Sequence, residues 1–493
     1  MFNPQASEKL TYDGPPLSIL MAVSMLDEQA YDIKIIDWHY GNFQERLVQE
    51  CREAMVFGVT CMTGFQIGKM IEALRLVKSV NPGIKVVCGG WHPTLLPEQT
   101  LKHELIDYIV MGQGPITFRA LLECLGNNAE PRDIKGVGYK RNGQLVINEI
   151  PPLENINRFP VPPYHLLENV EKFLVETSFA KKVLYLITSQ GCPNNCYFCS
   201  EAAFHHRKWT SRPVDDLMQF IEDFKRQHNI DGVAVSDSNF FVNEKRVAEF
   251  CRRMIPLRLR WGGTSSRSDQ LARYSDETWA LMRDSGLYDI FLGVESASNE
   301  TLRIMNKGCA IEDTLAVLPK AQQYGIKIQC AFVIGVPGSD IEQDFKTDME
   351  FINRVRKSGQ ATQFHMFTFA PFPGIPFLTE AMALGYRQPQ SLEEWGNYNL
   401  HMDVSPWIPA KYPRITDQLS VYFMFLTGNT NRVVRSVVPR WLHWAAVPAE
   451  RLCFRLADCR VSKCFFRFPV EYHIAKFALK HRRLLFGDKK LMF

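Results

Sequence analysis

Three cysteines crowd into one short loop near the middle of the chain. Cys192, Cys196 and Cys199 stand in the stretch SQGCPNNCYFCS, with the spacing C-x3-C-x2-C. This stretch follows an apolar run at 183–187 that predicts a β-strand, and its Gly, Pro and Asn residues favour a tight turn. Because a [4Fe–4S] cluster normally takes four cysteine ligands, three ligands would leave one iron open to bind and reduce another molecule.

Two other interpretations of this loop stay open. A structural zinc site with three cysteines and one histidine could be completed by His205 or His206. The three cysteines could also pack as free thiols, although Gly, Pro and Asn suit a turn better than a core. Zinc content compared with iron and sulfide content would separate these interpretations.

The composition is that of an ordinary globular protein, and 493 residues allow roughly two to four domains with sizeable cores. The chain has 13 cysteines, and residues 1–5 lack the basic region and apolar core of a secretory signal. Both features indicate a reducing compartment, so we expect a cytoplasmic protein. No run reaches the ~18 apolar residues that a membrane-spanning helix needs.

The C-terminal part differs from the rest in charge. Residues 431–493 contain 14 Lys and Arg against 4 Asp and Glu, although the whole chain has a net charge of only +4. Aromatic residues are interleaved with the basic ones, as in RWLHW at 440–444 and KCFFRFP at 463–469. Three interpretations stay open: a helical cap whose Lys and Arg reach into water, an interfacial helix on an anionic membrane, and a nucleic-acid surface. Of these we favour the cap first and peripheral membrane contact second, and we do not expect nucleic acid as a partner.

Three further cysteines lie in the same region. Cys453, Cys459 and Cys464 have the spacing C-x5-C-x4-C, which is unlike a usual cluster motif. We expect them to be packed thiols.

Strand-like apolar runs alternate with helical stretches through most of the chain, which predicts an α/β protein with parallel sheets. One alternation fills residues 1–150, and a second fills 181–390, where the strands end in polar or glycine residues as in barrel enzymes. Proline-rich residues 151–180 predict an extended linker, and residues 391–493 predict a helical C-terminal region. Within the first alternation we expect strands at 31–37, 56–60, 85–88 and 106–110, and helices at 43–53 and 66–79.

The cysteine spacing, with Phe198 directly before the last cysteine, resembles the signature of the radical SAM enzymes. The resemblance implies a partial (β/α)6 barrel at 181–390. It also implies that Cys192, Cys196 and Cys199 hold a [4Fe–4S] cluster whose open iron chelates S-adenosyl-L-methionine (SAM). Reduction would then split SAM and yield a 5′-deoxyadenosyl radical, with an external electron donor such as flavodoxin or ferredoxin as partner.

The resemblance assigns SAM-binding roles to residues at the strand ends. Phe198 would lie along the adenine, and Gly335 would form part of the wall on the adenine side. Asp237 and Asn239 would lie near the methionine amino group.

Two charged residues complete this implied set. Arg267 would meet the methionine carboxylate, and Glu295 would lie near the ribose or the methionyl end. For Glu295 a salt bridge to a nearby Lys or Arg is the alternative, because a carboxylate among apolar neighbours needs a partner.

Three loops near the N-terminus resemble successive loops of the cobalamin-binding domain that precedes one class of radical SAM enzymes. They read TCMTG at 60–64, GGWHPT at 89–94 and GQG at 112–114. Each lies just past the carboxyl end of an expected strand, where parallel sheets bind ligands. The resemblance implies a Rossmann-like cobalamin-binding domain at 1–150, with Thr60, Thr63, Gly89, Gly90, Gly112 and Gly114 as cofactor-binding residues.

Some features depart from that family's pattern. The third loop has Gln113 and Pro115 where the family commonly carries Glu. The chain begins almost at the Asn-Pro turn of residues 3–4, so we expect the first and central strand to be missing, through an upstream start or a damaged domain. The segment DWHYG at 37–41 is similar to the cobalt-ligating motif D-x-H-x-x-G, but its glycine comes one residue early. We therefore expect no protein histidine, His39 included, below the metal.

These resemblances predict a cobalamin-dependent radical SAM enzyme that methylates an unactivated carbon of a small-molecule or lipid-like substrate. The same architecture also supports radical cyclisation or rearrangement without methyl transfer. A tRNA-modifying enzyme is a further alternative, although no small β-barrel module is recognisable at the C-terminus. A sensor without enzymatic activity would need an output domain, for which the basic tail is a poor candidate.

Overall fold

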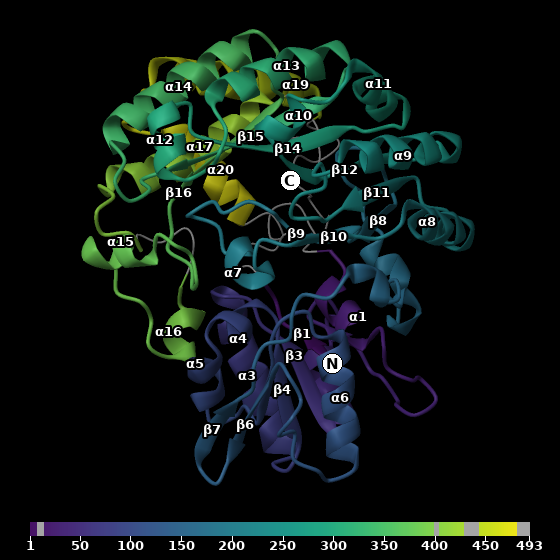
Figure 1. Cartoon of the computed structure of the whole chain (residues 1–493). Helices are drawn as coiled ribbons and strands as arrows, with labels where there is room; N and C mark the ends of the chain where they lie inside the picture. The colour runs from purple at the N-terminus through teal and green to yellow at the C-terminus, as the bar shows by residue number, and fades with distance from the viewer. Residues whose placement is uncertain (7–13, 399–403, 428–442, 481–493) are drawn as a thin grey trace.

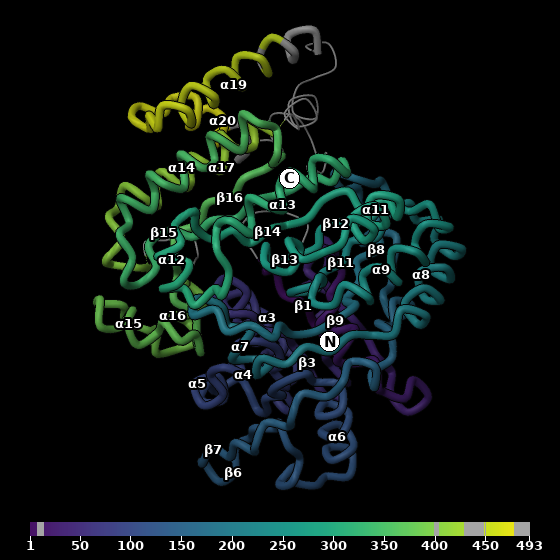
Figure 2. Tube along the Cα trace, turned by 45° about the horizontal axis from the view of Figure 1, so that its top comes forward, coloured from purple at the N-terminus to yellow at the C-terminus, as the bar shows by residue number. Residues whose placement is uncertain are grey.

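The computed structural model describes residues 1–6, 14–398, 404–427 and 443–480. An N-terminal α/β domain forms the lower half of the molecule in Figure 1, and a second α/β unit lies above it. The C-terminal helices cover the side of the second unit that faces away from the N-terminal domain, as Figure 2 shows most clearly.

The N-terminal domain is built on a seven-stranded sheet with the order β2-β1-β3-β4-β5-β6-β7. The first five strands in this order are parallel, and β6 and β7 add an antiparallel hairpin at one edge. The strands are β1 (Phe2–Asn3), β2 (Ile36–Asp37), β3 (Val56–Thr60), β4 (Lys85–Gly89), β5 (Tyr108–Val110), β6 (Val137–Arg141) and β7 (Gln144–Ile147).

Helices cover both faces of this sheet. Helices α1 and α6 pack together on one face, and α2 and α3 pack together on the other. The apolar side chains of α3 belong to a core of their own, whereas those of α1 and α6 join the core that continues into the second unit. The helices are α1 (Leu17–Val23), α2 (Phe43–Glu50), α3 (Phe65–Val80), α4 (Trp91–Leu95), α5 (Pro97–Lys102) and α6 (Pro115–Gly126).

The first strand, which we expected to be missing, is present in short form. Strand β1 lies between β2 and β3, where Phe2 pairs with both Ile36 and Val59. Its two residues also explain why β2 is much shorter than the strand predicted at 31–37, because a strand can extend only where its neighbour offers backbone groups to pair with.

The second unit is a partial barrel of parallel strands. Its strands form two sheets, with the orders β8-β11-β12 and β13-β14-β15-β16, which separate at Gly263. Gly263 has a φ of +69°, a left-handed conformation that glycine adopts readily, and it kinks the chain between β12 and β13. The strands are β8 (Val183–Leu186), β11 (Gly232–Val235), β12 (Arg260–Gly262), β13 (Thr264–Arg267), β14 (Asp289–Glu295), β15 (Lys327–Ile334) and β16 (Gln363–Thr368).

Side-chain caps fix where several barrel helices begin. The side chains of Asn243, Ser275, Ser298 and Asp340 each accept a hydrogen bond from the backbone N–H three residues later, at the starts of α9, α11, α12 and α14. These starts follow the strand ends, so the caps also fix the loops around the expected site. The helices are α8 (Val214–His228), α9 (Glu244–Met254), α10 (Ser268–Leu271), α11 (Asp276–Asp284), α12 (Asn299–Ile304), α13 (Ile311–Gln323) and α14 (Ile341–Lys357).

The C-terminal helices pack as a cap on the barrel. Helix α17 lies on β16, and α19 and α20 lie on α17. No helix in the described residues is long and apolar enough to cross a membrane. Trp441 lies outside the described residues. The helices are α15 (Leu378–Ala383), α16 (Leu392–Gly396), α17 (Lys411–Leu426), α19 (His443–Lys463) and α20 (Val470–Lys480).

The segment around α16 returns to the N-terminal domain. Trp395 is fully buried in the core that α3 also fills, and its indole Nε1 donates a hydrogen bond to Gln99 Oε1 at 2.7 Å. Its ring also meets His92 edge-on, at 5.6 Å between ring centroids. The predicted C-terminal region from residue 391 therefore starts as part of the first domain's core.

Replacing Trp395 by alanine tests this connection. The substitution removes a large buried ring and leaves Gln99 without its donor, so we expect the N-terminal domain to lose about 3–5 kcal/mol of unfolding free energy. Urea unfolding followed by circular dichroism measures the loss. The control is Leu384→Ala on an exposed side chain, which we expect to change stability by less than about 0.5 kcal/mol. Equal stability of the two variants would contradict this packing.

Candidate cofactor site

The cysteine loop lies between two short strands that close it at its base. Strand β9 (Ser189–Gly191) leads into Cys192 and pairs antiparallel with β10 (Trp209–Ser211), while α7 (Glu201–His205) follows the last cysteine. Gly191 has a φ of +82°, and a Cβ there would lie 2.1 Å from the backbone oxygen of Lys208. Only glycine fits this position, so the turn expected from the sequence is built into the backbone.

Hydrogen-bond donors surround the cysteine sulfurs. Asn194 and Asn239 each point a side-chain Nδ2 at Cys192 Sγ, at 3.4 and 3.5 Å. Arg267 Nη1 lies 3.2 Å from Cys196 Sγ. Donors in this arrangement stabilise sulfur that carries negative charge, which is the ligating form of cysteine. Burial raises the pKa of the Cys199 thiol to about 12, so a metal centre would have to displace its proton on binding.

The arrangement of the three cysteines bears on whether they would hold a single metal ion or a cluster. Within the described ranges, no group of three or more His, Cys, Asp or Glu side chains is arranged to hold one ion. A tetrahedral zinc site would bring its donor atoms within about 4 Å of one another, whereas the cysteines of an iron–sulfur cluster bind different irons and stand farther apart. His205, one of the histidines considered for zinc, is hydrogen-bonded to Glu201 through Nδ1 at 2.7 Å, a contact that leaves its Nε2 able to bind a metal. Zinc content compared with iron and sulfide content separates the two interpretations.

Asp237 is buried, and its carboxylate holds the turn that leads into the cysteine loop. Its Oδ1 accepts a hydrogen bond from the Thr188 backbone N–H at 2.6 Å. Its Oδ2 accepts from the hydroxyls of Thr188 and Ser189, at 2.5 and 2.6 Å. Arg246 Nη2 donates to the same Thr188 hydroxyl at 2.9 Å. The predicted contact with the methionine amino group thus competes with three hydrogen bonds that already position the loop.

Arg267 is likewise committed to groups around the cysteines. Besides Cys196, its guanidinium contacts Asp269 Oδ1, 2.9 Å from Nε, and the backbone oxygen of Lys307. To bind the SAM carboxylate as predicted, the Arg267 guanidinium would have to share the N–H groups that it already directs at Cys196, Asp269 and Lys307. The geometry therefore places Arg267 against the cysteine loop, where its charge would offset that of sulfurs that bind a metal.

For Glu295 the structure confirms the alternative of a salt bridge to a nearby Lys or Arg. Lys307 Nζ lies 2.8 Å from Glu295 Oε1, and both side chains are buried. Glu295 also has a φ of +67° at an irregularity in the pairing of β14, a strained conformation that tends to occur at functional sites. Lys307 in turn lies over the ring of Phe198, 5.7 Å from its centroid. The Glu295–Lys307 pair therefore borders the cysteine loop, and no sequence motif had identified Lys307.

The remaining two predicted SAM residues lie in different surroundings. Asn239 is buried beside Cys192, and among the described residues its Oδ1 has no hydrogen-bond partner, which leaves an acceptor for a ligand. Gly335 is covered by the segment before α17: Trp407 Nε1 donates to its backbone oxygen at 2.8 Å, and a Cβ there would meet Ile408 at 2.4 Å. Trp407 and Ile408 are thus further wall residues that no local sequence pattern identified.

The three N-terminal loops are joined into one surface by hydrogen bonds. Thr94 Oγ1 donates to the Gly90 backbone oxygen at 2.7 Å and accepts from the Gly112 backbone N–H at 3.0 Å. Thr63 Oγ1 lies 3.1 Å from His92 Nδ1. Gly90 has a φ of +108°, and a Cβ there would approach the Cys61 backbone oxygen to 2.9 Å. The predicted residues Thr60, Thr63, Gly89, Gly90, Gly112 and Gly114 thus occupy adjoining strand ends β3, β4 and β5.

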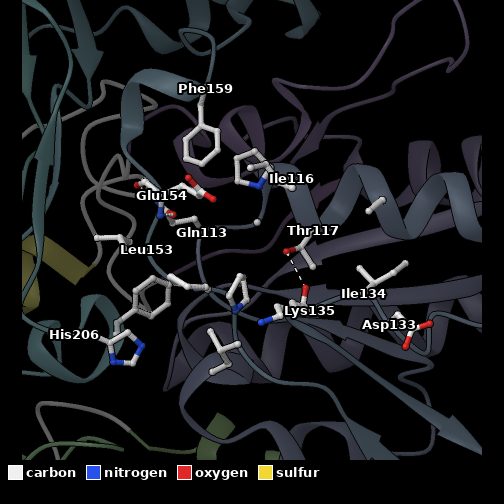
Figure 3. Close-up of a pocket in the computed structure, with 18 residues that line it drawn as sticks. Gln113, Ile116, Thr117, Asp133, Ile134, Lys135, Leu153, Glu154, Phe159 and His206 are labelled. Atoms are coloured by element: carbon white, nitrogen blue, oxygen red, sulfur yellow. Dashed lines mark hydrogen bonds between the residues drawn. The ribbon is translucent and has the colours of Figure 1, made fainter.

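A cavity of about 320 Å³ opens beside the third of these loops, as Figure 3 shows. Gly112 and Gly114 line it, whereas the other four predicted cofactor residues do not. Its walls come from the start of α6, the chain around Lys135, the linker at 150–154 and α7. The cavity is therefore shared between the N-terminal domain and the segment that follows the cysteines.

Gln113 ties the two domains together at this cavity. Its Nε2 donates to Gln190 Oε1 at 2.9 Å, within the strand that leads into Cys192, and its Oε1 accepts from the Glu154 backbone N–H at 2.7 Å. Trp91 of α4 packs against Phe204 of α7, with ring centroids 4.0 Å apart. Gln113, which stands where the family commonly carries Glu, thus forms a hydrogen bond between the two domains.

Two histidines lie near these strand ends, and their surroundings differ. His39 follows β2, on the other side of β1 from the three loops, and its Nδ1 lies 2.5 Å from Asp37 Oδ1. His92 belongs to the second loop but is fully buried against Trp395, and burial lowers its pKa to about 4.

The inner face of the barrel is open to solvent along β14, β15 and β16. Outward residues of these strands are covered by helices, as when Phe332 packs on Phe351 and Phe364 on Phe423. The inward residue Phe367, by contrast, is 44% exposed. Complete barrels of this kind fill their interiors with side chains. The partly exposed inward residues are Phe291, Gln329, Val333, His365 and Phe367.

A chain of polar side chains crosses this open face. Gln329 Nε2 donates to Asp289 Oδ2 at 2.7 Å, which turns its amide oxygen toward His365 Nε2 at 3.2 Å. An amide oxygen can only accept, so Nε2 of His365 carries the proton and Nδ1 remains an acceptor. Burial lowers the pKa of His365 to about 4, so the ring is neutral near pH 7. No motif marked these residues, because they are brought together only by the strand register.

Comparison with known proteins identifies both halves of this arrangement. Residues 6–122 match the model of the B12 binding domain, and residues 186–352 match that of the Radical SAM superfamily. The chain is 28% identical to an uncharacterized methyltransferase of Pyrococcus horikoshii, covering 75% of this chain and 79% of that protein. It is also 28% identical to the anaerobic magnesium-protoporphyrin IX monomethyl ester cyclase of Rubrivivax gelatinosus, over 66% of this chain and 60% of that protein.

A solved structure shares the fold over nearly the whole chain. The cobalamin-dependent S-adenosylmethionine radical enzyme OxsB, with aqua-cobalamin bound, superposes with a TM-score of 0.68. The match covers 99% of this chain and 76% of that one at 17% identity.

The buried His92 makes stability depend on pH. Its pKa is lowered from 6.5 to about 4, so the unfolded chain binds more protons between these values and stability falls as the pH drops from 6.5 to 4. His92→Gln should remove up to about 3 kcal/mol of this pH dependence. Urea unfolding at pH 6.5, 5 and 4 measures it, with His473→Gln on the exposed α20 as control. Equal pH dependence in His92→Gln and the unmodified protein would contradict a buried neutral imidazole.

Proposed function

We propose that this chain, which matches the models of the B12 binding domain and of the Radical SAM superfamily, methylates an unactivated carbon of its substrate. The observation that carries the proposal is the placement of the cysteine loop against the N-terminal domain through Gln113 and Gln190. That contact would bring the two cofactors to opposite sides of one space, as carbon methylation by two cofactors requires.

Cys192, Cys196 and Cys199 would hold a [4Fe–4S] cluster. With SAM bound at the open iron, such a cluster would donate the electron that splits SAM into methionine and a 5′-deoxyadenosyl radical, and bound cobalamin would supply the methyl group. The chain's own residues bind and orient these groups. Asp237 and Arg246 hold the loop through Thr188, as the hydrogen bonds in that turn support.

Residues around the loop would receive SAM. Asn239 offers the unpaired acceptor Oδ1, which suits the methionine amino group. Glu295 and Lys307 place one negative and one positive charge beside Phe198, where the ribose and the methionyl end are expected. Trp407 and Ile408 close the wall behind Gly335 and exclude water from it.

The N-terminal loops would bind cobalamin through backbone rather than through a histidine. Glycines at the ends of β4 and β5 allow close approach of a large ligand, and Gly112 and Gly114 line an existing cavity. His39 and His92 are each held through Nδ1, by Asp37 and by Thr63.

The open inner face of β14–β16 would bind the substrate. Phe291 and Phe367 flank the His365 ring, at 5.4 and 6.2 Å between centroids, and form an aromatic wall. The neutral His365 would accept a hydrogen bond from a substrate O–H or N–H through Nδ1. This combination favours a substrate with an apolar body and few polar groups, including a lipid-like molecule.

Radical cyclisation without methyl transfer is the second candidate. The similarity to a cyclase at 28% identity, equal to that of the methyltransferase, favours keeping it. Either reaction needs an external electron donor such as flavodoxin or ferredoxin, which we propose as partner. We also propose a cytoplasmic location.

Alanine at any one of the three cysteines tests the cluster. Because three protein ligands hold it, Cys196→Ala should lose the cluster and lower SAM cleavage at least about 100-fold. The measurement is 5′-deoxyadenosine formed by anaerobically reconstituted protein with SAM, hydroxocobalamin and dithionite, together with iron content. The matched control is Cys124→Ala on α6, which should keep both. SAM cleavage retained by Cys196→Ala would overturn the assignment.

The same assay distinguishes the two candidate reactions. S-adenosylhomocysteine formed together with 5′-deoxyadenosine supports methyl transfer, because one SAM then serves as methyl donor. Formation of 5′-deoxyadenosine alone, with cobalamin shown to be bound, supports the cyclisation candidate and contradicts methylation.

A further inference from the structure

The C-terminal helices expose apolar side chains that surface helices normally bury. The turn between α19 and α20 presents Phe468, which is 82% exposed. Along α20, Val470, Ile474 and Phe477 stand four and then three residues apart, so they share one helix face, and all three are exposed. We call the exposed apolar residues of this region the tail surface: Leu452, Phe454, Leu456, Phe465, Phe468, Val470, Ile474 and Phe477.

This exposure does not come from loose packing. Helix α19 buries Ala457 and Val461, and α20 buries Tyr472, so each helix has an inner face that is satisfied. Arg356 Nη1 pairs with Asp458 at 2.6 Å and anchors α19 to α14. The outer faces are therefore presented by a fixed scaffold, which Figure 2 shows on the far side of the molecule from the N-terminal domain.

The turn that carries Phe468 is held in a strained shape by one arginine. Phe468 and Cys464 have φ values of +52° and +47°, which are unfavourable for residues other than glycine. Arg460 donates to the backbone oxygens of Phe465, Arg467 and Phe468, and its Nε lies 2.6 Å from Glu471 Oε1. This clamp keeps the Phe468 ring directed outward instead of letting it fold back onto the helices.

Unpaired cations surround the apolar residues. Arg451, Arg455, Lys463 and Arg467 are exposed, and none of them forms an ion pair within the described part of the chain. Two carboxylates of this region are used elsewhere: Asp458 pairs with Arg356, and Glu471 with Arg460. On α19 the spacing of Leu452, Arg455, Leu456 and Lys463 places cations and apolar side chains on the same outer face.

We propose that the tail surface docks this enzyme on an anionic lipid membrane. Aromatic and aliphatic side chains enter the boundary between headgroups and acyl chains, while Lys and Arg meet the lipid phosphates.

Two exposed cysteines, Cys459 and Cys464, lie in the same region, so the expectation that these two are packed thiols was wrong.

Charge and apolar exposure favour an anionic membrane over the other molecules that could cover the tail surface. A second copy would bring the same cationic surface against itself, which like charges oppose. The C-terminal residues 481–493 have four Lys and Arg against one Asp, so their charge also opposes covering this surface. Nucleic acid would use the cations and the aromatic rings, but it gives Leu452, Leu456, Val470 and Ile474 nothing to bury against.

Co-sedimentation of the full-length protein with lipid vesicles tests the proposal. We expect at least about tenfold stronger binding to vesicles of about 70% phosphatidylcholine and 30% phosphatidylglycerol than to pure phosphatidylcholine. Binding should weaken as the salt rises from about 0.1 to 0.5 M, because surface charges are screened. The triple variant Phe468→Ser, Val470→Ser, Ile474→Ser should bind at least about tenfold more weakly, because it removes the inserting side chains.

A charge variant and a matched control complete the test. Each of Arg455→Gln, Lys463→Gln and Arg467→Gln should lower binding about fivefold, since a basic residue near an anionic surface contributes about 1 kcal/mol. The control Met382→Ser, Leu384→Ser removes apolar side chains that are 54% and 43% exposed at the C-terminal end of α15, outside the tail surface. This control should bind as the unmodified protein does.

Three outcomes would overturn the proposal. Equal binding to neutral and anionic vesicles would remove the role of charge. No binding by a monomeric protein would show that the tail surface is covered or inert. A dimer that the triple serine variant dissociates, seen by light scattering, would make a second copy the occupant instead.

Discussion

The structure depends on the hydrogen bonds that hold the turn ahead of Cys192. A buried carboxylate, Asp237, fixes Thr188 and Ser189, and Arg246 closes the arrangement from the other side of Thr188. A buried carboxylate is costly unless its acceptors are satisfied, and here three donors satisfy it. These hydrogen bonds fix the backbone at Thr188 and Ser189, the residues that lead into the cysteine loop.

The second constraint is the contact between the two domains. Gln113 reaches from the N-terminal sheet to Gln190, one strand residue before the glycine that opens the cysteine loop, and Trp91 packs on Phe204 after the loop. Helix α16 adds a further connection, because Trp395 fills the N-terminal core from a distant part of the chain. These contacts fix the carboxyl ends of the N-terminal strands opposite the cysteines. A reaction that needs two cofactors on either side of a substrate depends on such a fixed distance.

Local sequence patterns predicted most of the elements and identified candidate metal ligands, but they did not predict the contacts between distant segments. The cysteine spacing and the glycine loops were recognisable because each is complete within a few residues. The roles of Asp237 and Arg267 were harder to predict, because their partners Thr188 and Cys196 lie some 49 and 71 residues away in the chain. Lys307, Trp407 and the chain from Asp289 to His365 carry no motif at all, since only strand register and tertiary packing bring them to the site. The short β1 was missed because two residues are too few to show a strand pattern.

The central claim is that three cysteines leave one iron of a [4Fe–4S] cluster open for SAM. Electron paramagnetic resonance of the reduced, reconstituted protein tests it directly. Our account predicts that adding SAM changes the g-values of the cluster signal, because SAM becomes a ligand of the open iron, and that about four irons are bound per chain. A cluster signal that does not change at saturating SAM, or a protein that binds zinc in place of iron, would contradict it.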